Sequence, residues 1–597
     1  MNGWTGKVLR VNLSSGEIAC EEIDHEILKT YLGGRGLGAY FLYREVPPAC
    51  DPLGPQNLLA FCTGPLTGTS VPTGGRSSLS TLSPLTKTIF DANSGAAFGS
   101  RLKWAGYDAL LIMGKSETPV WLEVNALGGA LHPAGDLWGR DIPATVAKLA
   151  AKDSAVVCVG PAGENQVLMA AIMDEKSHAF GRGGVGAVMG SKNLKAISVT
   201  GKDRPVAADP ARLEFVQYEA RKWISASPRT SQGLPEFGTS VLVNLMNRYG
   251  VLPTRNFQEG CFDEAESISG ERLRDEYLVK RSACLSCPIG CKRQTKTKKE
   301  KGDGPEYETI YALGSNLGIS DFDALIEANY LCNHLGLDTI SVGATLSCAM
   351  ELAERGLLET DLRFGETAHI LEAINDIATR QGLGNLLAEG SRRLAEHCGA
   401  PETAMQVKGL EFPGYDPRGM QGQGLLYATS NRGACHLRGN MLGPELLGAP
   451  KMLDRHATSG KAGVLIVIQH TNTVIDSIGL CKFAGFAIGD EFFARLLSAV
   501  TGEHYEVQDM LSAGERIWNL ERLYNLRAGF SMADDTLPKR FLDTAHTKGG
   551  SQGKVVDLAP MLKEYYRFRG WDANGVPTPR KLKALGLAEI EQEVIYA

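Results

Sequence analysis

Up to about residue 205, the chain alternates short apolar stretches with glycine-rich turns, a pattern typical of β-strands. Residues 7–13 alternate polar and apolar side chains, and Ser14-Ser15-Gly16-Glu17 then supplies a turn. Further apolar stretches of strand length stand at 58–62, 109–113, 120–124, 155–159 and 196–199. We expect the glycine-rich segments between them to be loops, at 33–38, 74–76 and 181–186.

A polar stretch at 201–210 is interpreted as a boundary, because the pattern beyond it becomes helical. Apolar residues recur at helical spacing in six segments, at 211–226, 323–335, 344–355, 367–380, 384–397 and 491–500. A second interruption is Gly414-Tyr415-Asp416-Pro417-Arg418-Gly419, and the tail after residue 537 mixes strand-like and helical signals. We therefore predict an α+β protein with a β-rich domain at 1–205 and two mainly α-helical domains at 206–413 and 414–597.

Composition places the chain among globular proteins. Of its 597 residues, 43% are hydrophobic and 22% charged, which excludes disordered, collagen-like and coiled-coil chains. With a net charge of -6, the chain as a whole lacks the excess of basic residues that is typical of nucleic-acid-binding proteins. The sequence shows no export signal and no apolar stretch of about 18 residues, so we expect no membrane partner and a cytoplasmic location. In that reducing compartment, the 13 cysteines favour core positions, metal ligands or redox groups over disulfides.

Three cysteines stand close together in Cys284-Leu285-Ser286-Cys287-Pro288-Ile289-Gly290-Cys291. An iron–sulfur cluster needs several thiolates that converge on a small volume, and this spacing favours one. A structural zinc would require a second close pair, and none follows; core cysteines grouped by chance are the third interpretation. On chemistry alone, a fourth ligand could be any of Cys332, Cys348, Cys435 or Cys481.

A basic segment follows the cysteines at 292–301, where six of ten residues are lysine or arginine. Most such runs are solvated loops, and that is the first interpretation. The alternative is a docking patch for an acidic redox partner, since complementary charges speed encounter. Its position beside a redox group favours the alternative.

The segment Gly181-x-Gly183-x-x-Gly186 fits the dinucleotide-binding pattern. That pattern requires a helix directly after the loop, and residues 188–193 do not resemble a helix start. We therefore favour a phosphate-bearing ligand held by Arg182 and Arg76, each of which stands inside a glycine-rich segment.

Several further motifs occur in a fixed order with these segments. The ordered set is Gly74-Gly75-Arg76, Asp91-Ala92-Asn93-Ser94-Gly95, Gly181-Arg182-Gly183-Gly184-x-Gly186, the cysteine segment, Pro305-Glu306-Tyr307-Glu308-Thr309, Gly336-Leu337-Asp338-Thr339 and Asp476-x-x-Gly479-Leu480-Cys481. Each motif alone is weak, but the ordered set is highly specific. From about residue 4 to the last third, the chain resembles the tungsten-containing aldehyde:ferredoxin oxidoreductase family.

The resemblance implies a tungsten bis-pterin (tungstopterin) cofactor, a [4Fe–4S] cluster and Mg²⁺ that bridges the pterin phosphates. It also implies that the β-rich domain forms a base under the pterins and that the two helical domains enclose the site. Carried over by motif, Cys481 becomes the fourth cluster ligand beside Cys284, Cys287 and Cys291.

The resemblance also assigns the cofactor contacts. Arg76 would bridge the cluster and a pterin, whereas the phosphates and magnesium would be held by Asn93, Gly95, Arg182 and Gly183. The other contacts would be Asn333, Leu337, Asp338, Thr339, Arg432, Gly433, Arg438, Asp476 and Leu480.

Three positions depart from the family pattern. Asn333 stands where the family usually has aspartate, and Arg438 stands where a lysine is common. An arginine can still contact the same anionic ligand, in bidentate fashion. Glu327-Ala328-Asn329-Tyr330 lacks the histidine of the E-x-x-H motif that holds an iron between subunits in some members. We therefore expect no such bridging metal, and a homodimer is left open.

The implied activity is the oxidation of aldehydes to carboxylic acids, with electrons passed through the cluster to ferredoxin or to a ferredoxin-like or flavin electron-transfer subunit. The reaction needs a base and a hydrogen-bond donor, and the family motifs point to Glu308 and His436. Tyr307, Thr339 and residues 254–256 are expected to shape the pocket. The alternatives are a benzoyl-CoA reductase-like catalytic subunit, a non-catalytic iron–sulfur electron-transfer subunit and a zinc-stapled binding module.

Overall fold

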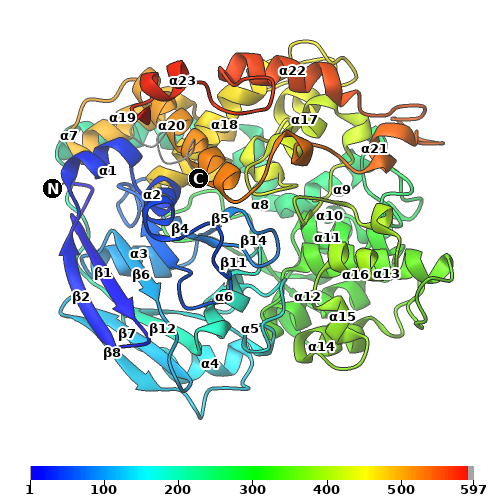
Figure 1. Ribbon diagram of the computed structural model, residues 1–597, viewed down its shortest axis with the longest axis horizontal. Helices are drawn as coiled ribbons and strands as arrows, with labels where there is room; N and C mark the ends of the chain where they lie inside the picture. Colours follow the sequence, from blue (N-terminus) through cyan, green and yellow to red (C-terminus); the bar gives the residue numbers. More distant parts are fainter. Residues whose placement is uncertain (1, 589–597) are drawn as a thin grey trace.

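The computed structural model describes residues 2–588, in which a β-rich region precedes a mainly helical one (Figure 1). Two six-stranded sheets occupy residues 7–200, and only short strands occur in the described residues beyond them. The predicted α+β class, with the strands first, is confirmed. Within residues 2–588, no helix has the length and apolar character needed to cross a membrane.

The first sheet has the strand order β2-β1-β6-β3-β4-β5, and only its β1–β6 pair is parallel. Its strands are β1 (Lys7–Asn12), β2 (Glu17–Glu22), β3 (Leu59–Thr63), β4 (Ser77–Leu82), β5 (Ile89–Ser94) and β6 (Ala109–Met113). Alternate residues face opposite ways: Leu9 packs toward the second sheet, whereas Val8 packs toward helices. The first sheet is therefore the middle layer of this part of the molecule.

The second sheet has the order β11-β10-β9-β12-β7-β8. Its strands are β7 (Val120–Asn125), β8 (Gly128–Pro133), β9 (Ser154–Cys158), β10 (Ile172–Asp174), β11 (His178–Phe180) and β12 (Leu194–Thr200). Leu122 and Val157 share one core with Leu59 and Phe61 of the first sheet. The two sheets thus pack face to face around apolar side chains.

Helices from both ends of the chain cover the other face of the first sheet (Figure 1). They are α2 (Gly34–Glu45), α7 (Pro210–Ala226), α18 (Lys461–Ile478), α19 (Asp490–Thr501) and α20 (Val507–Arg527). Ile478 and Ile517 belong to the same apolar cluster as Ala60 of β3. This packing brings the segment that carries Cys481 onto the N-terminal sheet.

The remaining helices form a second large core. The main ones are α9 (Leu242–Tyr249), α11 (Tyr307–Leu313), α12 (Phe322–Leu335), α13 (Thr339–Glu354), α14 (Ile370–Thr379), α17 (Gln421–Thr429) and α22 (Leu558–Arg569). Asp338 caps α13 by accepting hydrogen bonds from the backbone N–H groups of Ile340 and Ser341. Helix α11 begins at Tyr307. The motifs that contain Tyr307 and Asp338 therefore both lie at helix N-termini.

Many predicted elements are confirmed. The strand at 109–113 corresponds to β6 residue for residue, and the helices at 211–226, 323–335 and 491–500 match α7, α12 and α19 within one residue at each end. The helix predicted at 384–397 is instead two short helices, α15 (Gly384–Leu387) and α16 (Ser391–His397), interrupted at Gly390 with φ +85°. The tail forms α21 (Lys539–Asp543), α22 and α23 (Pro579–Ala584).

The loop predicted at 33–38 is wrong, because these residues begin helix α2. Their glycines serve close packing within a helix. A Cβ on Gly36 would lie 2.1 Å from the carbonyl oxygen of Tyr31, and one on Gly38 would lie 2.2 Å from Ser80 Oγ. The helix therefore sits directly on β4, closer than any side chain would permit.

The expectation that no helix follows Gly181–Gly186 is also wrong. Helix α6 (Val185–Ser191) begins within the glycine segment, and strand β11 precedes it. The unit is nevertheless no dinucleotide-binding fold, because β11 pairs antiparallel with β10 at the edge of the sheet. The predicted domain boundaries near residues 205 and 413 stay predictions.

Candidate active site and cluster site

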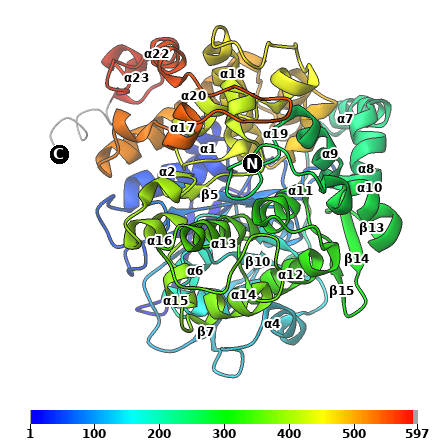
Figure 2. The ribbon, with the colours of Figure 1, turned by 90° about the vertical axis from the view of Figure 1, so that its right-hand side faces the viewer.

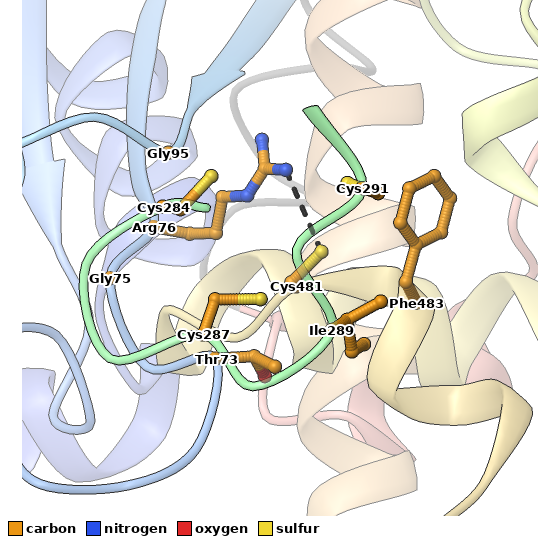
Figure 3. Close-up of a pocket in the computed structure, with 10 residues that line it drawn as sticks. All are labelled: Thr73, Gly75, Arg76, Gly95, Cys284, Cys287, Ile289, Cys291, Cys481 and Phe483. Atoms are coloured by element: carbon orange, nitrogen blue, oxygen red, sulfur yellow. Dashed lines mark hydrogen bonds between the residues drawn. The ribbon is translucent and has the colours of Figure 1, made fainter. Parts of the chain in front are cut away.

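Four cysteines line one small cavity with Arg76 (Figure 3). Cys284, Cys287 and Cys291 lie on the loop that joins β13 (Leu278–Ser282) to β14 (Lys292–Lys296). Left-handed backbone at Ser286 (φ +57°) and Gly290 (φ +65°) folds this loop back on itself. The fourth, Cys481, follows the end of α18.

Two backbone contacts bring Cys481 to the loop. Helix α18 ends at Gly479, whose φ of +87° turns the chain, and a Cβ there would lie 2.2 Å from Thr67 Oγ1. The N–H of Cys481 donates to the carbonyl of Thr73 at 3.2 Å, and the N–H of Thr73 donates to the carbonyl of Ser286 at 3.1 Å. Of the candidate fourth ligands, Cys332, Cys348 and Cys435 do not line this cavity.

The donor set of this thiol cavity fits an iron–sulfur cluster. Within residues 2–588, no set of three or more His, Cys, Asp or Glu residues could hold a single metal ion. Four cysteines around a common cavity are the ligands that a [4Fe–4S] cluster takes. Burial raises the pKa of the Cys284 and Cys287 thiols, and a metal that binds thiolates would release their protons.

Two cationic or polar side chains contact the sulfur atoms. Arg76 Nη2 donates to Cys481 Sγ at 3.6 Å. Gly95 leaves room for this arginine, because a Cβ there would lie 2.9 Å from the guanidinium carbon. His178 Nε2 lies 3.4 Å from Cys284 Sγ; no sequence motif marks this histidine, and sequence reasoning missed it.

A much larger cavity, of about 700 Å³, adjoins the thiol cavity. Four residues line both of them: Arg76, Cys284, Cys291 and Phe483. The large cavity lies between the N-terminal sheets, the start of α11, the α12–α13 connection and the segment around His436. It is therefore assembled from all three regions that the sequence predicted as domains.

The structure gathers ten of the predicted catalytic and cofactor-binding residues in the large cavity, besides the ligand cysteines Cys284 and Cys291, namely Arg76, Asn93, Arg182, Glu308, Asn333, Leu337, Asp338, Thr339, Arg432 and His436. Gly95 lines the thiol cavity instead. Neither cavity is lined by Gly183, Gly433, Arg438, Asp476 or Leu480. The cofactor contacts assigned to these five residues stay predictions.

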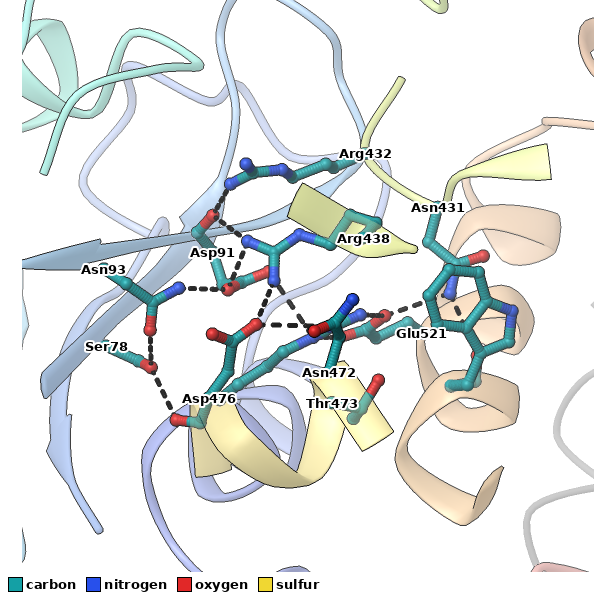
Figure 4. A network of polar contacts seen from close by, with 12 residues as sticks. Ser78, Asp91, Asn93, Asn431, Arg432, Arg438, Asn472, Thr473, Asp476 and Glu521 are labelled. Carbon is teal, nitrogen blue, oxygen red and sulfur yellow. Dashed lines mark hydrogen bonds and ion pairs between the residues drawn. The ribbon is translucent and has the colours of Figure 1, made fainter. Parts of the chain in front are cut away.

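Arg438 and Asp476 belong to a buried polar network beside the large cavity (Figure 4). Arg438 forms ion pairs with Asp476, at 2.5 Å, and with Asp91, at 2.8 Å. Asp91 Oδ2 in turn accepts a hydrogen bond from the Asn93 amide at 3.0 Å, and Ser78 Oγ lies 2.5 Å from Asn93 Oδ1. The network fixes the position of Asn93 at the cavity wall.

Arg182 is also held firmly. Its Nη2 donates to the carbonyl of Glu411 at 2.6 Å, and its Nε donates to Asp338 Oδ2 at 3.3 Å. The neighbouring Gly183 has φ +79°, and a Cβ there would lie 2.6 Å from the Phe90 ring. This glycine lets the loop pass over β5 so that Arg182 reaches the cavity.

Glu308 and His436 face each other inside the cavity, with Glu308 Oε1 and His436 Nε2 3.5 Å apart. The N–H of Gly414 donates to Glu308 Oε2 at 2.9 Å. Burial raises the pKa of Glu308 to about 8, although Arg182 opposes the shift. Burial and nearby arginines lower the pKa of His436 to about 3. At neutral pH the imidazole is therefore uncharged and the carboxyl largely protonated.

Sequence reasoning missed two more residues of the cavity wall. Tyr415 forms a ring contact with His436 at 5.3 Å between centroids; it stands in the glycine- and proline-rich interruption at 414–419, which was read only as a boundary. Cys435 Sγ accepts a hydrogen bond from Arg432 Nη2 at 2.8 Å. Burial alone would raise the pKa of Cys435, but three nearby arginines hold it below its ordinary value.

Of two expectations about this region, one is wrong and one holds only in part. Residues 254–256 do not line the large cavity; Asn256 instead donates to Glu351 Oε2 at 2.6 Å within the helical core. The basic segment at 292–301 is a loop only in part, because 292–296 form β14 and Lys301 begins β15 (Lys301–Asp303), with a turn at 297–300 between them. Arg293 and Thr295 are buried, since alternate side chains of β14 face inward.

The large cavity fits an anionic ligand. Arg76, Arg182 and Arg432 contribute to its wall, and guanidinium groups bind phosphate in bidentate fashion. Glu308 Oε1, His436 Nδ1 and Arg432 Nε have no hydrogen-bond partner although they are buried. Buried polar atoms normally have partners, so a bound group would complete this site.

Comparison with known protein families indicates which kind of ligand the large cavity could bind. A family model described as "Aldehyde ferredoxin oxidoreductase, N-terminal domain" matches residues 8–201, and one described as "Aldehyde ferredoxin oxidoreductase, domains 2 & 3" matches residues 216–587. The chain belongs to the aldehyde ferredoxin oxidoreductase family. Membership in this oxidoreductase family confirms the resemblance drawn from the ordered motifs.

Relatives in the aldehyde ferredoxin oxidoreductase family match along the whole chain. The tungsten-containing aldehyde ferredoxin oxidoreductase of Pyrococcus furiosus is 47% identical over 603 residues, which cover 99% of this chain and 100% of that protein. The aliphatic sulfonate oxidoreductase, WOR-like subunit, of the same organism is 30% identical and covers 100% of this chain and 99% of that protein.

A solved structure has the same fold. It is the active site complex BamBC of benzoyl coenzyme A reductase with 1,5-dienoyl-CoA, which matches with a TM-score of 0.87 at 23% identity. The match covers 100% of this chain and 98% of that chain. At this identity, the likeness concerns the fold alone.

Proposed function

We propose that this protein oxidises aldehydes to carboxylic acids and passes the electrons singly to a ferredoxin. One aldehyde and one water give one carboxylic acid, two protons and two electrons, which reduce two one-electron acceptors. The observation that carries the proposal is the pair Glu308 and His436 in a cavity that shares Arg76 with the thiol cavity. The 47% identity to a tungsten-containing aldehyde ferredoxin oxidoreductase supports it.

We propose a tungsten bis-pterin as the cofactor of the large cavity, with Mg²⁺ between its phosphates. Arg76, Asn93, Arg182 and Asp338 would hold it, since they line the cavity together. When bound, such a cofactor supplies two-electron redox chemistry at the metal. We also keep as a proposal that residues 1–205 form a base domain enclosed by 206–413 and 414–597.

Glu308 and His436 would orient the substrate and move its protons. His436 is neutral over the physiological range because its pKa is about 3. The N–H of the neutral imidazole ring can donate a hydrogen bond to the aldehyde oxygen. Glu308, whose pKa is about 8, would accept a proton from the attacking water when it is ionised. Tyr415 lies against the imidazole ring and limits its rotation.

Arg76 lies in the wall between the two cavities and contacts Cys481 Sγ. Electrons leaving the active site would therefore pass to the thiols by way of its side chain. A [4Fe–4S] cluster at Cys284, Cys287, Cys291 and Cys481 accepts one electron at a time, which suits a ferredoxin acceptor. The cytoplasmic location and a homodimer stay predictions.

Metal analysis of protein purified without oxygen tests the proposal, together with an assay that couples aldehyde oxidation to viologen reduction. We expect about four irons and about one tungsten per chain, and activity with aldehydes but not with benzoyl-CoA or alkyl sulfonates. Iron without tungsten, molybdenum or pterin would favour a non-catalytic electron-transfer subunit. Zinc alone would favour a binding module, and either result would overturn the proposal.

A further inference from the structure

The loop that carries the thiols is the outermost layer over the cluster site. Leu285 is 36% exposed, and Ser286 and Pro288 are exposed, whereas Cys287 is only partly exposed. Cys287 itself is thus partly accessible to solvent. An electron carrier that approaches this loop comes as close to the thiols as the fold allows.

The C-terminal end of helix α7 borders this loop on one side. Ile224 of α7 packs in one apolar cluster with Ile289 of the loop, and the partly buried Cys287 packs against this cluster. On the outer face of α7, Trp223 is 56% exposed and Tyr218 is 55% exposed. Lys222 Nζ lies 4.3 Å from the centre of the Tyr218 ring, so the exposed face is both aromatic and cationic.

Strand β13 borders the loop on the other side, because it leads directly into Cys284. Val279, Lys280 and Arg281 are exposed on this strand. Figure 2 shows α7 and β13 on the same side of the molecule. The two elements therefore flank the thiol loop with apolar and positively charged side chains.

Within residues 2–588, the positive charges of this surface are not paired with acidic side chains of the same chain. In the described part of the chain, Lys222, Lys280 and Arg281 form no ion pair, whereas many other surface cations do. Three of the nearby acids are already paired: Asp275 with Arg274, Glu276 with Arg272, and Glu219 with Arg495. Glu214 of α7 is an exposed acid that forms no ion pair with another described residue, which leaves three cations against one acid. A net positive surface around the loop remains for a partner.

We propose that this α7–β13 surface, formed by Tyr218, Lys222, Trp223, Lys280, Arg281 and Leu285, is the docking site of a small acidic iron–sulfur electron carrier. Exposed aromatic side chains surrounded by charges are typical of protein interfaces, and complementary charge favours an acidic partner. The lysines at 296–301 lie at the end of β14, in the turn that follows and at the start of β15, and they would steer the carrier at longer range. The proposal rests on the proposed ferredoxin-linked function.

The test compares electron transfer from the holoenzyme to a small acidic ferredoxin with transfer to viologen. The triple variant K222E/K280E/R281E reverses the charge, and the single variant W223S removes the aromatic side chain. We expect the triple variant to lower the ferredoxin-linked kcat/KM about tenfold or more at low salt and to weaken its salt dependence. The viologen-linked rate should stay within about twofold, because viologen needs no docking surface.

Helix α22 supplies a matched control. It also presents an exposed aromatic residue, Phe568, on the same helix as two exposed cations, Lys563 and Arg567, but it packs on α17 and α18 away from the thiol loop. The variant K563E/R567E should leave both rates unchanged. If it lowers the ferredoxin-linked rate as much as the triple variant, a general charge effect is responsible and the proposal is overturned.

Two further outcomes would overturn it. One is an unchanged ferredoxin-linked rate in both the triple variant and W223S. The other is a variant that changes the oligomeric state but not the rate, which would assign the surface to a second copy of this chain. If aldehyde activity is absent altogether, the proposed function fails, but docking is still measurable by reducing the protein chemically and timing the reoxidation of its cluster by ferredoxin.

Discussion

The thiol cavity and the large cavity share Arg76, yet their linings differ in the way they would bind the proposed ligands. In the thiol cavity, four cysteines supply the expected bonds, and one arginine is the charged neighbour that lines it. The large cavity is lined by residues from all three regions, among them four arginines and several amides and acids. The binding energy of the proposed ligands would thus be concentrated in a few bonds in one cavity and spread over many contacts in the other.

This difference sets what a single substitution can do. Removing one of four metal bonds leaves an iron without its ligand, whereas removing one of many polar contacts lowers affinity by only about 1 kcal/mol. The exception in the large cavity is a side chain that moves protons, since no neighbour replaces it. Glu308 and His436 should therefore behave more like the thiols than like the surrounding contacts.

The largest effect is expected for C287A. This change removes one proposed cluster ligand, so iron content and the low-temperature electron paramagnetic resonance signal of the reduced cluster should be lost with ferredoxin-linked activity. C348A is the matched control, because Cys348 is buried in the helical core and lines neither cavity. Equal iron content in both variants would show that Cys287 is not a ligand of the cluster.

The next largest effect is expected for E308Q, which keeps the shape of the side chain but cannot accept a proton. We expect kcat to fall about 10²- to 10⁴-fold, as for the loss of a general base, with iron and tungsten content unchanged. E327Q, at an acid that pairs with Lys299 outside both cavities, should retain full activity. A variant E308Q with normal kcat would contradict the assignment.

A smaller effect is expected from pH. The pKa of Glu308 is about 8, and the base is inactive when protonated, so kcat should fall about tenfold for each unit below pH 8 and level off above it. The pKa of His436 is about 3, so no second transition should appear between pH 5 and pH 8. A rate that rises as the pH falls would mean that Glu308 acts as a proton donor.

The smallest effect is expected for N333D, which restores the acid that the family usually has at this position. Asn333 is one of many residues in the wall of the large cavity. We expect the pterin content to be unchanged and kcat/KM to change by no more than about fivefold, roughly 1 kcal/mol. A loss of pterin in this variant would show that the binding is not spread over many contacts.

The sequence predicted elements well where a periodic pattern was long, as in α7, α12 and α19. The prediction was wrong where a glycine can serve either of two structural purposes, close packing or a turn. The sequence predicts a loop at Gly36 and Gly38, but in the structure Gly36 permits close packing against Tyr31 and Ile517, and Gly38 permits the helix to lie against β4. Gly479 and Gly390 do adopt the positive φ of a turn. Local sequence cannot separate the two uses, because close packing depends on a neighbour far away in the chain.

The residues of the candidate site likewise include some that the sequence indicated and some that it did not. The spacing of Cys284, Cys287 and Cys291 already indicated a cluster, because a short loop keeps them close in any fold. The family motifs indicated Glu308 and His436, which the structure then places 3.5 Å apart. His178 had no sequence signal, since its contact with Cys284 joins two separate sheets.

By itself, the sequence determined the α+β order of the chain, the three-cysteine loop and the family, and the family motifs implied the roles of Cys481 and Arg76. Only the tertiary structure decided that His178 contacts Cys284, that Tyr415 packs against His436 and that α7 borders the exposed loop. The physical reason is that periodicity and spacing act within a few residues. Cavities, pKa shifts and surfaces instead arise from packing between segments that are hundreds of residues apart.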